Sequence, residues 1–316
     1  MLEILHRLRG SQAPEHGDIA ESCKLSTETT VFNDQVRVGR HYVKFGLEIP
    51  RPSNRLYEGI AFIEPGFGGV GWSSDNLMHA LAVRGVATLR YDPVRRDNDP
   101  LLFRLLEPQA VHTDTVTALA RHVPNNNRLV HEVPEIKSYD LFRHAHLPHS
   151  MGGHPATEHS STNKENTDVI INLATVGLGS PTLAQLARNL PAGIPRGIFN
   201  EFIPGIFEGY LEVSAVNLAS SVKYFFHNPI RTISEAMSCL TADLRPAIRR
   251  LGESGVKTAF IGFERDCLIP PNDEIANDVD RFSVIPRLGH MAPQVKPNEV
   301  ANQIVKTIED FGLAAT

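Results

Sequence analysis

Short apolar runs rich in β-branched residues recur along the chain and constrain its fold more than any other feature. They occupy residues 58–64, 86–91, 168–174, 256–263 and 281–285. Strands that are apolar on both sides must be covered on both faces, and this is the usual condition of a parallel sheet. Stretches with helical periodicity lie between these runs, at 73–84 and 111–123, and after the last run, at 297–311. Strands that alternate with helices in this way predict a doubly wound α/β fold with a mostly parallel sheet.

The two ends of the chain add simpler features. Residues 1–28 are polar and poorly patterned, and we expect an N-terminal tail there. Residues 29–38 and 41–49 alternate enough to predict a hairpin that turns at Gly39. The last helix should begin near Pro297 and end at Gly312, with its apolar residues on one stripe.

One connection is too long for a single crossover helix. About 80 residues separate the runs 168–174 and 256–263, whereas one crossover needs about 10–15 residues. We expect the excess, residues 181–240, to form a helical cap between two parts of one core, 29–180 and 241–316. The insertion is rich in aromatic residues, namely Phe199, Phe202, Phe207, Tyr210, Tyr224, Phe225 and Phe226. They can pack the helices of the cap or line an acyl pocket.

Composition excludes several classes of protein. The chain has 316 residues, of which 41% are hydrophobic and 21% charged, as in ordinary soluble proteins. With a net charge of −5 and no long basic run, we expect no nucleic-acid partner. Three distant cysteines suggest reduced thiols, and we interpret Cys267 as a packed one. Neither a secretory signal nor a membrane-spanning run is visible, so we expect a cytoplasmic protein.

The stretch 147–153, Leu-Pro-His-Ser-Met-Gly-Gly, carries the strongest chemical signal. It follows a run that predicts a strand, 139–146, and precedes a possible helix. Its pattern is close to G-x-S-x-G, in which a serine lies on a sharp strand-to-helix turn. A small residue two places after Ser150 allows the strained backbone, and Gly152 supplies it. The helix N-terminus behind such a serine offers N–H groups to a developing negative charge.

A serine alcohol needs a base to become a nucleophile, and the base needs an orienting acid. Asp266 comes just after one predicted strand, and His290 lies between the last predicted strand and the final helix. The carboxyl ends of parallel strands open on one edge of the sheet, so Ser150, Asp266 and His290 can converge there. The order Ser, Asp, His is the one expected for such a turn. Glu264 is a local alternative to Asp266, while no carboxylate closely follows the run that ends at residue 174.

These segments together resemble the α/β-hydrolase superfamily, from about residue 42 to residue 311. The turn at 148–153 is similar to its nucleophile elbow, the loop around Asp266 to its acid loop, and Gly289-His290 to its histidine loop. The resemblance implies that Ser150 is the nucleophile, that His290 is the base, and that Asp266 fixes the tautomer of the histidine.

The resemblance extends to the oxyanion loop. Residues 65–69, Pro-Gly-Phe-Gly-Gly, are similar to the glycine-bearing loop of the superfamily, and residues 90–92 to the strand end that follows it. It implies an oxyanion hole formed by the backbone N–H groups of Phe67 and Met151. It also implies a helical cap at the position of the long insertion, and a reaction that requires neither cofactor nor metal.

Two prolines depart from the superfamily pattern. Pro148 replaces the first glycine of the elbow and removes a backbone donor at the end of a central strand. Pro65 stands where the oxyanion loop usually has a histidine. Neither residue transfers a proton. Both motivate an alternative of another class, a non-catalytic member that binds a small ligand under its cap.

Five histidines crowd around the serine turn, namely His144, His146, His149, His154 and His159. His144 and His146 share one face of the predicted strand, but His149 lies on the turn and the other two on a helix. No nearby cysteine or acidic ligand has tetrahedral spacing with them. We therefore expect no metal site, and interpret these residues as packed or solvated histidines around a polar pocket mouth.

The sequence thus predicts a serine hydrolase that cleaves a carboxylic ester through an acyl-enzyme on Ser150. The apolar cap suggests a small, hydrophobic acyl or aromatic substrate. A thioester, a lactone, an amide, or a carbon–carbon bond in a vinylogous keto acid remains as an alternative bond. A carboxylate nucleophile is disfavoured because the elbow carries a serine.

Overall fold

A computed structural model describes residues 29–39, 41–66, 71–92, 110–178, 242–266 and 268–315. Within these residues, eight strands form one sheet in the order β1-β2-β4-β3-β5-β6-β7-β8. The β1–β2 and β2–β4 pairs are antiparallel and all other pairs are parallel, which confirms the predicted mostly parallel sheet. The strands are β1 (Thr29–Val38), β2 (His41–Pro50), β3 (Ile60–Ile63), β4 (Thr88–Tyr91), β5 (His144–His146), β6 (Thr167–Leu173), β7 (Lys257–Phe263) and β8 (Arg281–Ile285).

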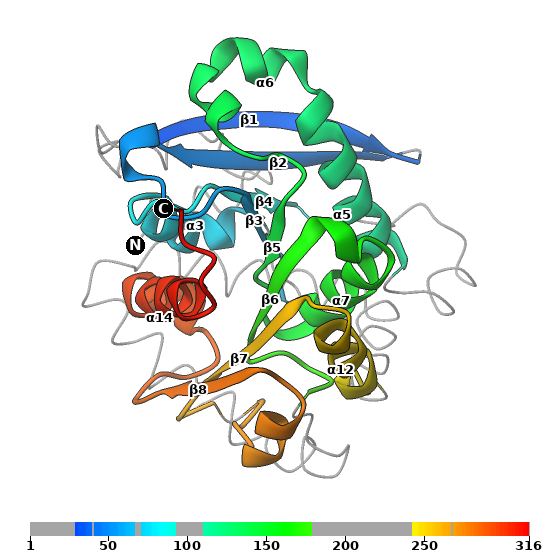
Figure 1. Cartoon of the computed structure of the whole chain (residues 1–316), viewed down its shortest axis with the longest axis vertical. Helices are drawn as coiled ribbons and strands as arrows, with labels where there is room; N and C mark the ends of the chain where they lie inside the picture. Colours follow the sequence, from blue (N-terminus) through cyan, green and yellow to red (C-terminus); the bar gives the residue numbers. More distant parts are fainter. Residues whose placement is uncertain are drawn as a thin grey trace, which may run out of the picture.

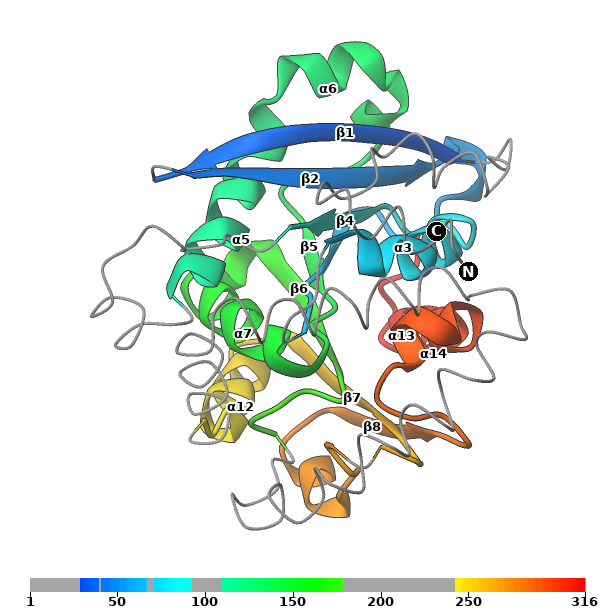
Figure 2. The same cartoon turned by 180° about the vertical axis from the view of Figure 1, so that it is seen from behind.

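Helices cover both faces of the sheet (Figures 1 and 2). On one face lie α3 (Asp75–Ala82), α13 (Ala292–Val295) and α14 (Pro297–Asp310). On the other lie α5 (Ala110–His122), α7 (Gly153–Thr162) and α12 (Arg245–Glu253), with α6 (Asn127–Glu132) beyond α5. The predicted last helix is confirmed, and the hairpin turns at Gly39 as expected.

The pleat of each strand divides its side chains between two cores. In β3, Ala61 and Ile63 pack with α3 and α14, while Ile60 and Phe62 pack on the side of α5. Because these strands are buried on both faces, nearly all of their side chains must be apolar, as we expected from the sequence. The same division places Ala145 and Leu147 on the α3 side.

Strand β5 is shorter than predicted. Residues 139–143 are not part of it, because a turn precedes the strand: the Asp140 carboxylate accepts a hydrogen bond from the N–H of Phe142, and the Asp140 carbonyl from that of Arg143. An aspartate that bonds to the backbone two residues on favours a turn over a strand. The apolar pattern of this segment did not reveal the turn.

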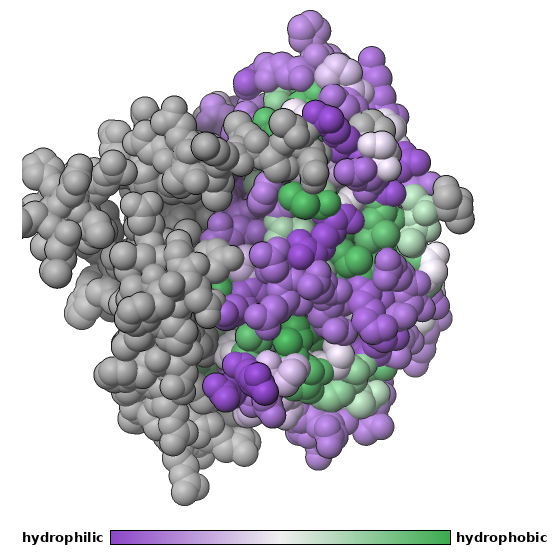
Figure 3. Space-filling view, turned by 90° about the vertical axis from the view of Figure 1, so that its left-hand side faces the viewer, coloured by the Kyte–Doolittle hydropathy of each residue, from purple (hydrophilic) through white to green (hydrophobic). Residues whose placement is uncertain are grey.

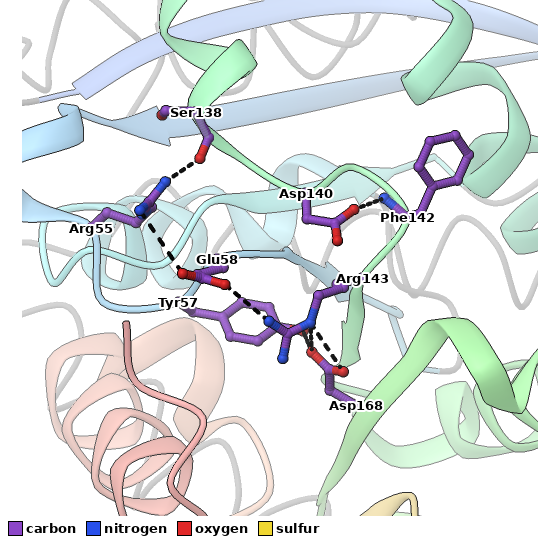
Figure 4. Close-up of polar contacts among 8 residues, drawn as sticks. All are labelled: Arg55, Tyr57, Glu58, Ser138, Asp140, Phe142, Arg143 and Asp168. Carbon is purple, nitrogen blue, oxygen red and sulfur yellow. Dashed lines mark hydrogen bonds and ion pairs between the residues drawn. The ribbon is translucent and has the colours of Figure 1, made fainter. Parts of the chain in front are cut away.

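A polar network ties together the amino ends of β3, β5 and β6 (Figure 4). The Arg143 guanidinium contacts Asp168 at 3.0 Å and Glu58 at 3.1 Å, and the Tyr57 hydroxyl donates to Asp168 at 2.7 Å. Burial, and then the charge of Asp168, raises the pKa of Tyr57 well above its ordinary value, so the phenol stays a donor. Arg55 donates to the Ser138 carbonyl. This edge of the sheet is therefore bound together by side chains that pair with one another.

The predicted tail, 1–28, and the predicted cap, 181–240, lie outside the described residues, as does Cys267. Residues 242–315 contribute β7 and β8 to the sheet, where β7 pairs with β6. The described part of the face in Figure 3 is mostly hydrophilic, with separate hydrophobic patches between. No helix within the described residues has both the length and the apolar character needed to cross a bilayer.

Candidate active site

Ser150 lies on a strained turn between β5 and α7. Its φ of 54° is in the left-handed region, which costs a non-glycine residue on the order of 1 kcal/mol or more. A short 3-10 turn, Ser150–Gly152, follows and leads directly into α7. Among the described residues, the other non-glycine residues with positive φ are Ala174 and Arg287, which follow the carboxyl ends of β6 and β8. Backbone strain is thus concentrated at one edge of the sheet.

Glycines make room for this turn. A Cβ atom on Gly152 would lie 2.5 Å from the carbonyl oxygen of Glu64, and one on Gly66 would lie 2.9 Å from the Cβ of Ser150. The N–H of His149 donates to the same Glu64 carbonyl at 3.0 Å, which holds the turn against the end of β3. The sequence prediction for Gly152 rested on the local turn, whereas the structure adds this contact with a neighbouring strand.

Asp266 and His290 are in contact. Asp266 follows β7, His290 precedes α13, and Asp266 Oδ2 lies 2.8 Å from His290 Nδ1. The other carboxylate oxygen accepts 2.8 Å hydrogen bonds from the backbone N–H groups of Leu268 and Ile269. Both side chains are largely buried, so the carboxylate is oriented from two sides and can hold a proton on His290 Nδ1.

Glu264 does not share this position. It is exposed, and its Oε2 accepts a hydrogen bond from the backbone N–H of Arg287 at 2.8 Å. Of the two carboxylates that the sequence left open, the structure brings Asp266 to His290.

His149 joins the Ser150 turn to the His290 loop, a contact that the sequence did not reveal. Its Nε2 donates to the carbonyl oxygen of His290 at 2.9 Å, and the two rings are in contact, with centroids 4.8 Å apart and planes tilted by 37°. Burial, and then the neighbouring His290, lowers the pKa of His149 to about 3, so its ring is neutral at ordinary pH. Its position directly before Ser150 was the one available signal.

Pro148 interrupts the β5 ladder without displacing the turn. The assigned strand ends at His146 and pairing resumes as an isolated bridge between His149 and Leu173. The Pro148 carbonyl still accepts from the N–H of Leu173 at 2.8 Å. The expected loss of a backbone donor is therefore limited to one place in the ladder. Of the expected oxyanion donors, Met151 is the residue after Ser150 on the 3-10 turn, and Phe67 lies outside the described residues.

Three of the five histidines form a separate buried cluster. His144 and His146 of β5 meet His159 of α7, while His149 belongs to the serine turn and His154 lies elsewhere on α7. Burial lowers the pKa of His144 to about 4, of His146 to about 3 and of His159 to about 2. These three side chains are packed in the interior, so they are not the solvated histidines at a pocket mouth that the sequence left as one interpretation.

Comparison with solved structures adds a fold likeness. A 2-hydroxy-6-oxo-6-phenylhexa-2,4-dienoate hydrolase from a Rhodococcus species is 13% identical, with a TM-score of 0.63 over 89% of this chain and 99% of that one. A thermophilic esterase from Thermogutta terrifontis is 13% identical, with a TM-score of 0.57 over 89% and 99%. A proline iminopeptidase from Mycobacterium smegmatis is 16% identical, with a TM-score of 0.60 over 89% and 99%.

No family model matches the chain, and no curated protein matches its sequence. The family likeness therefore comes from the three-dimensional structure. The strand order, the helices on both faces and the similarity to these enzymes agree on one architecture. The chain has the α/β-hydrolase fold.

Proposed function

We propose that this protein is a serine hydrolase that cleaves a carboxylic ester through an acyl-enzyme on Ser150. The observation that carries the proposal is the buried 2.8 Å pair of Asp266 and His290, whose loop is hydrogen-bonded to the residue directly before a serine held at a φ of 54°. His149, which hydrogen-bonds to the His290 carbonyl, keeps the two loops together. The esterase among the similar structures supports this bond type.

In the proposed reaction, Ser150 Oγ attacks the ester carbonyl while its proton passes to His290 Nε2. Asp266 holds the other ring nitrogen protonated and stabilises the imidazolium that forms. The backbone N–H groups of Met151 and Phe67 stabilise the oxyanion. His290 then gives its proton to the leaving alcohol as the carbon–oxygen bond breaks. Water repeats the sequence on the acyl-enzyme, which releases the acid and restores the Ser150 hydroxyl.

The first prediction concerns covalent labelling of Ser150. Incubation with a fluorophosphonate should give one adduct per chain, measured by intact mass, because only an activated serine attacks phosphorus at a useful rate. The adduct should be absent from Ser150→Ala and present in Ser160→Ala, which removes another buried serine ten residues along the chain.

Labelling that persists in Ser150→Ala would place the nucleophile elsewhere. A folded wild-type protein with no adduct would reject catalysis by this serine and favour the non-catalytic ligand-binding alternative.

A second bond type has structural support. Two similar structures are meta-cleavage product hydrolases, and a third is the dienoate hydrolase compared above. Parallel assays with p-nitrophenyl esters of increasing chain length and with a 2-hydroxy-6-oxo-dienoate would separate the two. A higher kcat/KM on the dienoate than on every ester would replace the ester assignment.

A further inference from the structure

Three imidazoles meet where β5 faces α7. His144 and His146 are two residues apart on β5 and therefore point to the same face of the sheet, towards His159 on the helix. Their exposed fractions are 3%, 0% and 1%, respectively. One ring nitrogen from each lies within 4.8 Å of the other two. The three rings are close together because the fold packs α7 over β5, and not because of their spacing in the sequence.

Within the part of the chain that the structure describes, each ring has one nitrogen without a hydrogen-bond partner. These are Nδ1 of His144, Nε2 of His146 and Nε2 of His159, all fully buried. A buried polar atom left unpaired costs on the order of 1–3 kcal/mol, and native proteins contain few of them. Three such atoms in one cluster of histidines point to a shared ligand.

The opposite nitrogen of each ring has a polar partner. His146 Nδ1 lies 2.5 Å from the buried Glu64 carboxyl group, and His144 Nε2 lies 3.3 Å from the Leu141 carbonyl. His159 Nδ1 lies 3.0 Å from the Thr117 hydroxyl and 3.3 Å from the side-chain nitrogen of Asn163. When these outer nitrogens carry the protons, the inner nitrogens present lone pairs. Metal-binding histidines have this arrangement, with an outer carboxylate, carbonyl or hydroxyl that fixes the ring.

We propose that His144, His146 and His159 bind one divalent transition-metal ion, of which Zn²⁺ is the best match. Three neutral imidazoles suit zinc and similar ions, whereas Mg²⁺ and Ca²⁺ require oxygen ligands. Zinc–nitrogen bonds of about 2.0–2.1 Å place tetrahedral nitrogens about 3.4 Å apart. The present nitrogens lie within 4.8 Å of one another, so metal binding requires them to approach by up to about 1.4 Å.

The ion would fasten the two elements that hold the serine turn. His146 comes four residues before Ser150 and His159 nine residues after it, so both arms of the turn would share one metal. The proposal departs from the sequence expectation of no metal because α7 brings His159 onto β5. A carboxylate, absent from the sequence pattern, is supplied by Glu64 from the end of β3.

The second prediction is a test of this site with zinc itself. Protein treated with EDTA and then freed of chelator should take up one Zn²⁺ per chain, measured by elemental analysis and by calorimetric titration. His159→Gln should weaken binding by about 100-fold or more, because one of three ligands is lost. Cobalt substitution should give the visible absorption of a four-coordinate ion in the wild type and not in the variant.

His154→Gln is the matched control, since His154 lies on the same helix, also has an unpaired ring nitrogen, and stands outside the cluster. It should bind zinc like the wild type. His144→Asn provides a second cluster variant if His159→Gln does not fold, as judged by circular dichroism. Folded wild type that takes up no stoichiometric metal, or a folded cluster variant that binds zinc as tightly as the wild type, would overturn the proposal. The titration also works on Ser150→Ala protein, so its outcome is separate from that of the serine chemistry.

Discussion

At the residue scale, the candidate site depends on a few atoms whose partners are well defined. Asp266 uses both carboxylate oxygens, one towards His290 and one towards two backbone N–H groups. An acid held in this way can orient the imidazole without moving during a reaction. Its value to catalysis would lie in the tautomer that it enforces.

The third prediction follows from this geometry. Asp266→Asn should lower kcat for ester hydrolysis by about 10³–10⁴-fold, because an amide can donate its own proton to Nδ1 and reverse the tautomer. Glu264→Gln, at the exposed carboxylate two residues earlier, should keep kcat within a few-fold of the wild type. Equal losses of kcat in the two variants would contradict the assignment of Asp266 as the acid that orients His290. The measurement is steady-state kinetics on a p-nitrophenyl ester.

The sequence placed Ser150, Asp266 and His290 because each follows a recognisable strand. It could not choose between Asp266 and Glu264, since both lie at the end of the same strand and only the loop path decides which one reaches His290. It missed the role of His149 because that role is a contact with a backbone carbonyl 141 residues away. Contacts of this kind leave no local pattern.

At the element scale, the turn between β5 and α7 is fixed by contact with β3. The carbonyl of Glu64 accepts from His149 and leaves no room for a side chain at Gly152. The strand, turn and helix therefore behave as one unit attached to the neighbouring strand.

The fourth prediction tests that attachment. Gly152→Ala would place a methyl group 2.5 Å from the Glu64 carbonyl oxygen, which is held by the N–H of His149, so we expect a loss of about 2 kcal/mol or more in the free energy of unfolding. Gly252→Ala in α12 is the control. Its Cβ would meet nothing closer than 3.8 Å, and alanine should stabilise that helix by up to about 1 kcal/mol. Urea unfolding measures both, and similar stability of the two variants would contradict the steric reading.

Sequence periodicity predicted the strands and the last helix well, because burial on both faces of a sheet or on one stripe of a helix demands it. It failed at residues 139–143, where the side chain of Asp140 makes a turn within an apolar run. It also gave no sign of α6, whose first turn is capped by the side chain of Asn126. A run of three asparagines indicates an end of one helix as readily as the start of another.

At the scale of the whole molecule, buried titratable groups connect stability with pH. Burial lowers the pKa of five histidines below the ordinary 6.5, to between about 2 and about 4 in His144, His146, His149 and His159, and in the same direction in His154. It raises the pKa of Asp75 to about 6 and that of Glu64 well above its ordinary value. The histidines resist protonation in the folded state, whereas the two carboxyls favour it.

The fifth prediction is a loss of stability as the pH falls from about 6.5 towards 5. The unfolded chain binds protons at the four histidines whose pKa in the folded protein is about 4 or lower, and each contributes about 1.4 kcal/mol per pH unit. Asp75 and Glu64 act in the opposite direction, so the net loss should be about 3 kcal/mol per pH unit. The midpoints of urea unfolding at pH 7.5 and 5.5, both in the presence of EDTA, measure this loss of stability.

The change in unfolding free energy per pH unit should be smaller in His144→Asn than in the wild type. It should stay unchanged in His131→Asn, which removes an exposed histidine. A midpoint that is level or rises on acidification would show that these rings are protonated in the folded protein.

The positive φ angles at Ser150, Ala174 and Arg287 have a consequence for protein engineering. Glycine adopts this conformation without steric cost, so replacement by glycine at these positions relieves strain that any other side chain must bear. A selection of variants for thermal stability alone would therefore favour substitutions in the loops that follow β5, β6 and β8. Improvements found there would remove the nucleophile or loosen its surroundings. Stabilising changes are better sought at the amino edge of the sheet, where Arg143 and Asp168 already pair.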